Sequence, residues 1–189
     1  MTMREEQILP IPANMEVEEF RNSLAIKYKW SKLMGYGLLF FSVIWNSFIF
    51  FGFLMNMIQE NLPFFVYLFM LPFIGAGIFL FYYGLAGIMN HTIITVSFDS
   101  VNVKHTPLPW VGNKEIFKYD IKQLYVKQHI HRGKNGTSYT YSVNIIDKAN
   151  KDIKLVDNLQ NPSEASFIEK KMEQFLKIED KPVSGEYKG

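Results

Sequence analysis

Residues 33–90 read LMGYGLLFFSVIWNSFIFFGFLMNMIQENLPFFVYLFMLPFIGAGIFLFYYGLAGIMN and contain a single charged side chain, that of Glu60. On either side of Glu60 lies an uncharged run, of 27 and 30 residues, and each run exceeds the about 20 residues that a helix needs to cross a bilayer. Apolar side chains occupy every face of the first run, whereas a helix in a soluble core has one apolar stripe. The stretch therefore predicts a membrane α-helical hairpin, with helices at about 33–58 and 63–89.

The rest of the chain is polar, because its 131 residues hold 37 of the 38 Asp, Glu, Lys and Arg residues. The absence of Cys excludes disulfides, thiolate zinc sites and a cysteine nucleophile, and a net charge of +2 gives no support for a nucleic-acid binder. The sequence shows no phosphate-binding glycine loop outside the membrane stretch, no paired carboxylates and no histidine–carboxylate spacing. We therefore expect no enzyme, no cofactor and no metal site.

Basic residues flank both outer ends of the hairpin, and the connection at residues 59–63 has none. Since Lys and Arg concentrate on the cytoplasmic side of membrane spans, we expect a multi-pass protein of the cell (inner) membrane with both termini in the cytoplasm. The flanking residues are Arg21, Lys27, Lys29 and Lys32 before the hairpin, and Lys104, Lys114 and Lys118 after it.

Each predicted membrane helix carries a stripe of small or polar residues. Small residues let two helix backbones approach, and an Asn can hydrogen-bond across the contact. We expect these stripes to pack against each other within the hairpin, with docking of another membrane protein as the alternative. The stripes are Ser42, Asn46 and Asn56 on the first helix and Gly77, Gly84 and Gly87 on the second.

After Asn90 the apolar residues recur with period two, which is typical of strands. A long hairpin is predicted around Gly133-Lys-Asn-Gly136, because Asn-Gly is a strong tight-turn signal. Opposing residues in it number to a sum near 269, which places Leu124 against Ile145. Alternation before the membrane stretch leaves a strand at 23–29 and a helix continuous with the first span both open. The expected strands are 92–98, 101–105, 114–118, 123–132, 137–147 and 153–156.

The last predicted helix begins with Asn161 as N-cap and Pro162 at the first helical position, and Glu164 is placed to complete a capping box. Its apolar stripe predicts that the helix covers a core, with four charged residues on the solvent side. The stripe is Ala165, Ile168, Met172, Phe175 and Leu176, and the solvent side is Glu169, Lys170, Lys171 and Glu173. The expected parts are an N-terminal cytoplasmic segment 1–32, the hairpin 33–90, a mainly-β domain 91–178 and a tail 179–189 without fixed structure.

Strands in meander order followed by one amphipathic helix are the order of a pleckstrin-homology-like (PH-like) barrel. Six short segments carry a further resemblance: residues 45–46, 107–113, 123–125, 137–141, 167–169 and 181–186. Through them the chain resembles a family of uncharacterised bacterial membrane proteins with two transmembrane helices followed by a PH-like domain. The resemblance implies a membrane-anchored binding or assembly platform and offers no catalytic residues; the N-terminal zinc ribbon of some relatives is absent, since the chain has no Cys.

The most basic surface predicted for the domain lies on the long hairpin. It could hold an anionic lipid headgroup or a protein partner, and a merely solvated face is the alternative. Two of its residues are histidines on one strand face, but no Asp, Glu or Cys lies beside them, so a metal is not expected. The candidate binding residues are Lys127, His129, His131, Arg132 and Lys134, with Trp110 from a Pro-rich loop that either caps the domain or contacts the membrane or a partner.

These observations predict a non-enzymatic, membrane-anchored protein that binds or scaffolds at the cytoplasmic membrane surface. The expected partners are membrane lipids and a protein, either a second copy or another chain, and no nucleic acid. The alternative is an accessory subunit of a larger membrane enzyme or transport complex.

Overall fold

The computed structural model describes residues 10–55, 63–134 and 136–187. The chain divides into two compact units. The helical unit comprises residues 29–91 and 106–110, and the β unit comprises the remainder: 1–28, 92–105 and 111–189.

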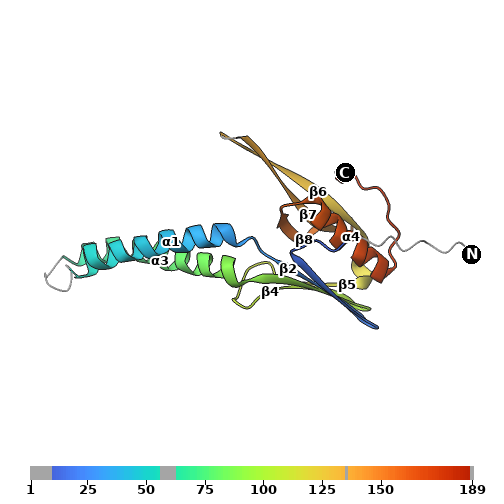
Figure 1. Cartoon of the computed structure of the whole chain (residues 1–189), viewed down its shortest axis with the longest axis horizontal. Coiled ribbons are helices and arrows are strands. Elements are labelled where there is room, and N and C mark those ends of the chain that lie inside the picture. Colours follow the sequence, from blue (N-terminus) through green and yellow to red (C-terminus); the bar gives the residue numbers. More distant parts are fainter. Residues whose placement is uncertain (1–9, 56–62, 135, 188–189) are drawn as a thin grey trace, which may run out of the picture. The chain divides into compact units, whose positions relative to one another are not determined.

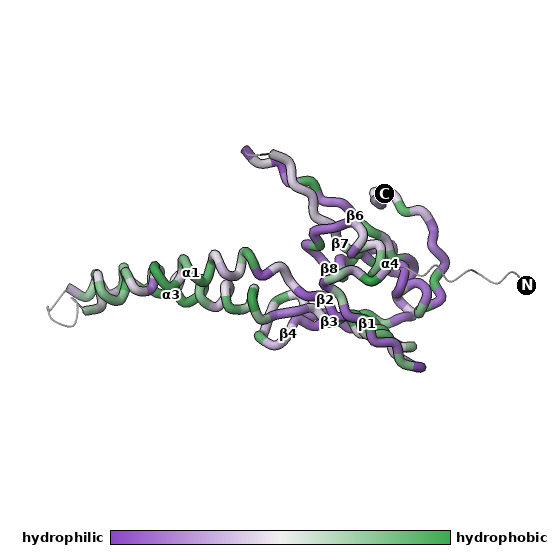
Figure 2. Tube along the Cα trace, in the orientation of Figure 1, coloured by the Kyte–Doolittle hydropathy of each residue, from purple (hydrophilic) through white to green (hydrophobic). Residues whose placement is uncertain are grey.

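The helical unit is a pair of helices that pack side by side (Figure 1). Helix α1 spans Lys32–Ile49 and continues as a π-helical turn, η1, at Phe50–Leu54. Helix α3 spans Phe64–Met89. Both helices are long and apolar enough to cross a membrane, and Figure 2 shows hydrophobic residues along them. The predicted end of the first helix, 56–58, lies outside the described residues.

The first sheet of the β unit has five strands in the order β1-β2-β3-β4-β5. Strand β2 forms at Ser23–Lys29, where the sequence left strand and helix open. Strand β1 was not predicted, because only Met15 and Val17 alternate with its three Glu residues and the pattern is too short to register. The bounds are β1 Met15–Phe20, β3 His91–Ser97, β4 Ser100–Thr106 and β5 Lys114–Phe117.

The second sheet has three strands in the order β6-β7-β8, and a short 3-10 turn, η2 (Lys118–Asp120), leads into it. The strands are β6 Ile121–Gly133, β7 Gly136–Asp147 and β8 Asp152–Leu159. Leu124 pairs with Ile145 and Ile130 with Tyr139, so the predicted sum of 269 is confirmed. The two apolar runs and the turn between them allow no other register that buries one face.

Helix α4 spans Pro162–Leu176 and follows both sheets. Its N-terminus differs from the predicted capping box. The Asn161 side chain makes no cap hydrogen bond; its amide donates to Oε1 of Glu164 over 2.9 Å, and Oε2 of Glu164 accepts the N–H of Gln160. Glu164 is drawn away because it also accepts from the amide of Asn14, 150 residues earlier in the chain.

The predicted solvent side of α4 is wrong for two residues. Glu169 and Glu173 are 8% and 6% exposed, and they lie next to the apolar stripe of Ile168 and Met172. They are buried because the helix packs against β6 and because polar groups of that strand reach their carboxyls, as described below.

Between Glu179 and Tyr187 the tail has no helix or strand of its own, but it contacts the β6–β7 sheet. The N–H of Tyr187 donates to the carbonyl oxygen of Val126 on β6 over 2.8 Å, and its ring lies 5.1 Å from that of Tyr141. A turn from Val183 to Glu186 precedes this contact. The tail has no apolar period, but one backbone hydrogen bond and one aromatic contact are enough to fix it. The described residues thus show two apolar helices, two sheets and a C-terminal helix, and a PH-like barrel stays a prediction.

Candidate docking surface

The β6–β7 hairpin is buried at its base and exposed beyond it. At the base, Leu124 and Val143 are 1% and 0% exposed. Further out, Ile130 is 55% exposed and Tyr139 is 48% exposed, although the two residues are still paired. We call residues 128–140 the arm. Figure 1 shows it projecting away from the rest of the β unit as a two-stranded ribbon.

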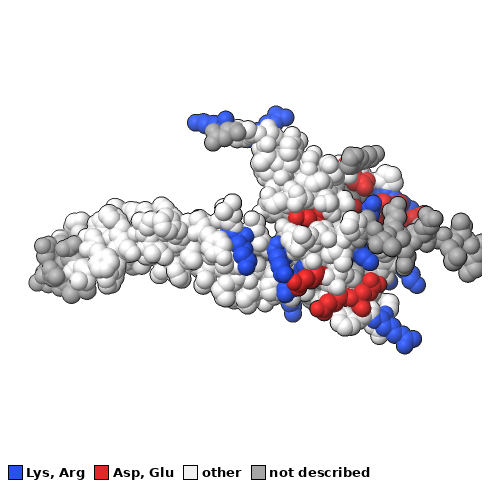
Figure 3. Space-filling model, in the orientation of Figure 1, with Lys and Arg blue, Asp and Glu red and all other residues white. Residues whose placement is uncertain are grey.

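The arm is cationic at its tip. From residue 121 to residue 146 the chain has four Lys or Arg residues and no Asp or Glu. Lys127, at the base, lies 3.5 Å from the carboxylate of Asp152. Arg132 and Lys134 are exposed and make no ion pair with any residue that the structure describes. Figure 3 shows cationic side chains at the tip of the projecting ribbon.

A buried polar network underlies the base of the arm. Asp152 accepts hydrogen bonds from the amide of Asn144 (2.7 Å) and the hydroxyl of Tyr125 (2.8 Å). Burial works against the charged form of Asp152, but these hydrogen bonds and Lys127 outweigh it and lower the pKa of the carboxyl. Burial, helped by Asp152, raises the pKa of Tyr125 to about 12. The network fixes Lys127 in place as a structural cation.

The two predicted histidines are held by the neighbouring strand. Ser142 donates to Oδ1 of Asn144, so its oxygen accepts from Nε2 of His129 over 2.8 Å. This direction is the reverse of the one that activates a serine nucleophile. Burial, with help from Lys154, lowers the pKa of His129. Nε2 of His131 forms a hydrogen bond of 2.8 Å with the hydroxyl of Thr140, in which the tautomer of the ring decides the donor. No group of three His, Asp or Glu residues in the described chain is placed to hold a metal ion.

The outer edge of β6 is covered at the base and open along the arm. β6 is the outer strand of its sheet, and Val126 directs its N–H to the carboxyl of Glu169 and its C=O to Tyr187. Residues two apart in an antiparallel strand direct these groups to the same edge. Gln128 and Ile130 therefore present unpaired backbone groups along the edge beyond Tyr187, where only the arm continues.

Two buried carboxyls with raised pKa values, those of Glu169 and Glu173, lie where α4 covers the base of β6. Burial, reinforced by Glu186 and Asp180 of the tail, raises the pKa of Glu169 to about 7, and one of its oxygens has no hydrogen-bond partner among the described residues. Burial and Asp180 raise the pKa of Glu173 to about 8, and Glu173 accepts the amide of Gln123 over 3.2 Å. Both carboxyls are therefore largely or partly protonated at neutral pH.

A cavity of about 780 Å³ lies between the tail, β6 and the β7–β8 turn. Lysines line it, but each has a partner already. Lys122 donates to Oδ1 of Asn150, Lys127 pairs with Asp152, and Lys181 lies 3.4 Å from a carboxylate oxygen of Glu179. The exposed cations of the arm are therefore the better candidates for binding.

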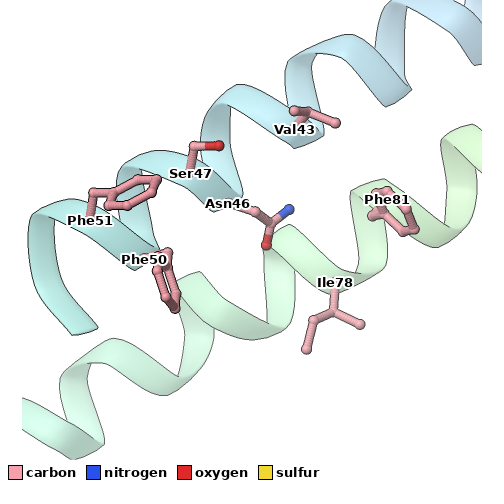
Figure 4. Close-up of a pocket in the computed structure, with 7 residues that line it drawn as sticks. All are labelled: Val43, Asn46, Ser47, Phe50, Phe51, Ile78 and Phe81. Atoms are coloured by element: carbon pink, nitrogen blue, oxygen red, sulfur yellow. The ribbon is translucent and has the colours of Figure 1, made fainter. Parts of the chain in front are cut away.

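In the helical unit, the predicted packing residues lie between α1 and α3. The amide of Asn46 donates to the carbonyl oxygens of Ser42 (2.7 Å) and Gly77 (3.1 Å), and Figure 4 shows Asn46 pointing from α1 toward α3. A methyl group on Gly84 would lie 2.7 Å from the backbone nitrogen of Leu39.

The contact between α1 and α3 also involves residues that were not predicted. A methyl group on Gly87 would lie 3.2 Å from Cα of Gly35, so these helices approach closely there as well. Gly35 was not among the predicted packing residues, and neither was Trp45, whose indole N–H donates to the carbonyl oxygen of Phe73. Asn56 lies outside the described residues.

A pocket of about 450 Å³ opens on the two helices (Figure 4). Five of its seven lining residues are apolar, and the amide of Asn46 is already used in the helix contact. The pocket is therefore an apolar recess on the two helices. Its lining residues are Val43, Asn46, Ser47, Phe50, Phe51, Ile78 and Phe81.

Trp110 belongs to the helical unit and not to the arm. Its ring lies 5.5 Å from that of Trp30 and 4.8 Å from that of Tyr83. Asn90 fixes the same loop, because its side chain both donates to and accepts from the backbone of Leu108. Trp110 thus packs on aromatic residues of its own unit, and whether its loop caps the β domain or contacts the membrane or a partner stays a prediction.

Sequence reasoning found the basic residues of the arm but not the open edge beside them. The signals that could have found it are weak: Glu169 and Glu173 are four residues apart and border the apolar stripe, and Tyr187 is a lone aromatic residue in a polar tail. None of them reveals which strand edge they cover.

A scan of the chain against protein-family models found no match, and a search of curated proteins found no relative.

Proposed function

We propose that the chain is a non-enzymatic docking module, anchored in the cell membrane by α1 and α3, whose arm binds an anionic protein partner at the cytoplasmic surface. The observation that carries the proposal is the arm itself: a projecting ribbon with an open backbone edge, an exposed Ile130–Tyr139 pair and two cations that have no acidic partner among the described residues. A two-stranded ribbon is marginally stable alone, so an exposed one is suited to being completed by a partner. The PH-like fold and the family resemblance are part of the proposal.

A protein partner is favoured over lipid headgroups on grounds of magnitude. Each basic residue near an anionic membrane contributes about 1 kcal/mol, so Arg132 and Lys134 together contribute about 2 kcal/mol. The two helices already tether the chain far more strongly. A headgroup also leaves the backbone N–H and C=O groups of the open edge unpaired, whereas an added strand pairs them.

Two observations support the proposed topology: the pairing of β2 with β3 and the basic residues that flank the hairpin. β2 leads into α1, β3 follows α3, and β2 and β3 are adjacent in one sheet. Both outer ends of the hairpin must therefore be on the same side of the membrane, and the Lys and Arg flanks favour the cytoplasmic side. A reporter fused after Gly189 is expected to be active only in its cytoplasmic form; activity in its external form would contradict the orientation.

The docking proposal is tested by photo-crosslinking from the arm. A photo-reactive amino acid replaces Tyr139 in the full chain, in its own membrane, and adducts are separated by mass. We expect protein adducts that disappear in Arg132→Glu/Lys134→Glu and persist in the charge-matched control Lys148→Glu/Lys151→Glu, whose residues are exposed at the β7–β8 turn.

The other outcomes are equally informative. Adducts to lipid alone would contradict a protein partner and favour headgroup binding. An adduct to a subunit of a membrane enzyme or transporter would favour the accessory-subunit alternative. Equal loss of adducts in both charge variants would show that the tip cations have no special role.

A further inference from the structure

A second outer strand in the β unit has the opposite charge to the arm. β1 is the outer strand of the five-stranded sheet, and three of its six residues are Glu. Glu18, Glu19 and Phe20 at its end are exposed, Phe20 to 59%. Glu19 lies 3.7 Å from Lys171 on the surface, a distance and exposure that leave the carboxylate available to a further cation.

The backbone of β1 determines which of its residues can accept another strand. The N–H of Met15 bonds to Pro12 outside the sheet, so Met15 points away from β2. Residues two apart share this direction, hence Val17 and Glu19 also present their N–H and C=O groups at the open edge. On β6 the corresponding residues are the even-numbered ones, since Val126 directs its carbonyl to Tyr187.

These directions restrict how the two edges can pair. In an antiparallel ladder, residues that face each other both point toward the partner or both point away. An even-numbered residue of β6 must therefore face an odd-numbered residue of β1. Among the odd sums of residue numbers, 147 pairs six positions but includes Lys127 at the base. The sum 149 gives the longest ladder that stays on the arm, five positions, with residues 129–133 facing residues 20–16.

The charges are complementary in this register. Glu18 faces His131, and Glu19 faces Ile130 and lies diagonally next to Arg132, within reach of its long side chain. Phe20 faces His129 and extends the exposed apolar surface. Pairing of one arm with another would instead bring the tip cations Arg132 and Lys134 near their own copies, and like charges across a ladder are destabilising.

We infer that the partner of the arm is a second copy of this chain, whose β1 edge adds as an antiparallel strand to β6; the inference rests on the proposed function of the arm. The contact joins two different surfaces, the β1 edge of one copy and the β6 edge of the other. Each copy has both edges, so it can contact two neighbouring copies. A short ladder with exposed ion pairs is weak between free molecules. Anchoring both copies in one membrane raises their effective concentration, and it is there that the contact forms.

Disulfide crosslinking tests the register. Because the chain has no native Cys, only the introduced cysteines can form disulfides. Glu18→Cys and His131→Cys, placed in one chain, would face each other as a non-hydrogen-bonded pair, at a separation a disulfide can bridge. The full chain is reconstituted in proteoliposomes and oxidised. We expect disulfide-linked oligomers, and several-fold fewer in the control pair Glu18→Cys/Lys148→Cys. Equal yields would overturn the register.

Charge exchange tests the partner. Energy transfer between labelled full-length copies in one membrane is expected to fall several-fold in Arg132→Glu/Lys134→Glu and in Glu18→Lys/Glu19→Lys. It should return when these two variants are mixed, because the reversed arm of one then meets the reversed β1 of the other. Absence of this recovery would overturn the inference.

The two proposals fail separately. Photo-adducts from Tyr139 to a different protein, without energy transfer between copies, would contradict the second copy and leave the docking function standing. Absence of protein adducts together with absence of energy transfer would contradict both.

Discussion

The base and the arm of the β6–β7 hairpin share one hydrogen-bonded ladder and one register, yet they have opposite environments. At the base, α4 and the tail cover the outer edge and the side chains are buried. Along the arm the same two strands continue without cover. A continuous ladder is therefore no measure of local stability, because packing on its faces and edge supplies most of the stabilisation. This difference is the basis on which we propose the arm as the docking surface of the β unit.

The largest expected effect is on the free energy of unfolding, when a side chain is truncated at the base and another on the arm. Leu124→Ala removes a fully buried side chain and should cost about 2–5 kcal/mol of unfolding free energy. Ile130→Ala, six residues along the same strand, should change it by less than about 0.5 kcal/mol. Denaturant unfolding of the purified chain in detergent, followed by circular dichroism, measures both. Similar losses for the two variants would show that the arm is packed after all.

The next effect is on the pH dependence of stability and concerns Glu173, the buried carboxyl at the base. The pKa of Glu173 is raised from 4.5 to about 8, so its contribution to stability is complete below pH 4.5 and is lost as the pH rises to about 8. Glu173→Gln keeps an acceptor for Gln123 and cannot ionise. The variant should match the parent at pH 4.5 and be more stable at pH 9, by on the order of 5 kcal/mol.

Thermal unfolding across pH 4.5–9 measures this effect. The control is Glu179→Gln, whose carboxylate is 70% exposed and should leave the pH profile unchanged. Parallel profiles for Glu173→Gln and the parent would contradict a buried, protonated Glu173.

A smaller effect is expected where the tail covers the edge. Tyr187→Pro removes the N–H that bonds to Val126, together with the ring that meets Tyr141, and should cost about 1 kcal/mol. Tyr187→Ala keeps the N–H and should cost less. In hydrogen exchange, the proline variant should make the amides of the base exchange more like those of the arm. No change in exchange at the base would show that the tail does not protect it.

The smallest effect is expected on the arm itself. His131→Ala removes one exposed hydrogen bond to Thr140, and surface substitutions of this kind usually stay within about 0.5 kcal/mol. Thermal unfolding is the measurement, with Ser142→Ala as the contrasting variant, because its buried hydroxyl joins His129 to Asn144. A loss for His131→Ala as large as that for Ser142→Ala would mean that the arm contributes to folding.

The sequence predicted what depends on long, regular patterns. Fifty-eight residues with one charge give the helical hairpin, and two alternating runs around a Gly-rich turn give the register that joins Leu124 to Ile145. The errors all concern contacts between segments far apart in the chain. Glu169 was assigned to solvent because a helical pattern does not tell which neighbour borders its stripe. The contacts of Tyr187 with Val126 and Tyr141 were not foreseen for the same reason.

The order of the strands also limits how the protein can be made. β1 and β2 are synthesised before α1, and their sheet neighbour β3 only after α3. During synthesis the first two strands therefore wait, with one edge of β2 unpaired, until about sixty residues of membrane segment have been inserted and returned to the same side. A soluble fragment that starts after the hairpin lacks the first two strands of its own sheet. In the proposed membrane topology, insertion of the helices is thus a step in folding the β unit, and a hairpin that fails to return would leave an exposed strand edge open to aggregation.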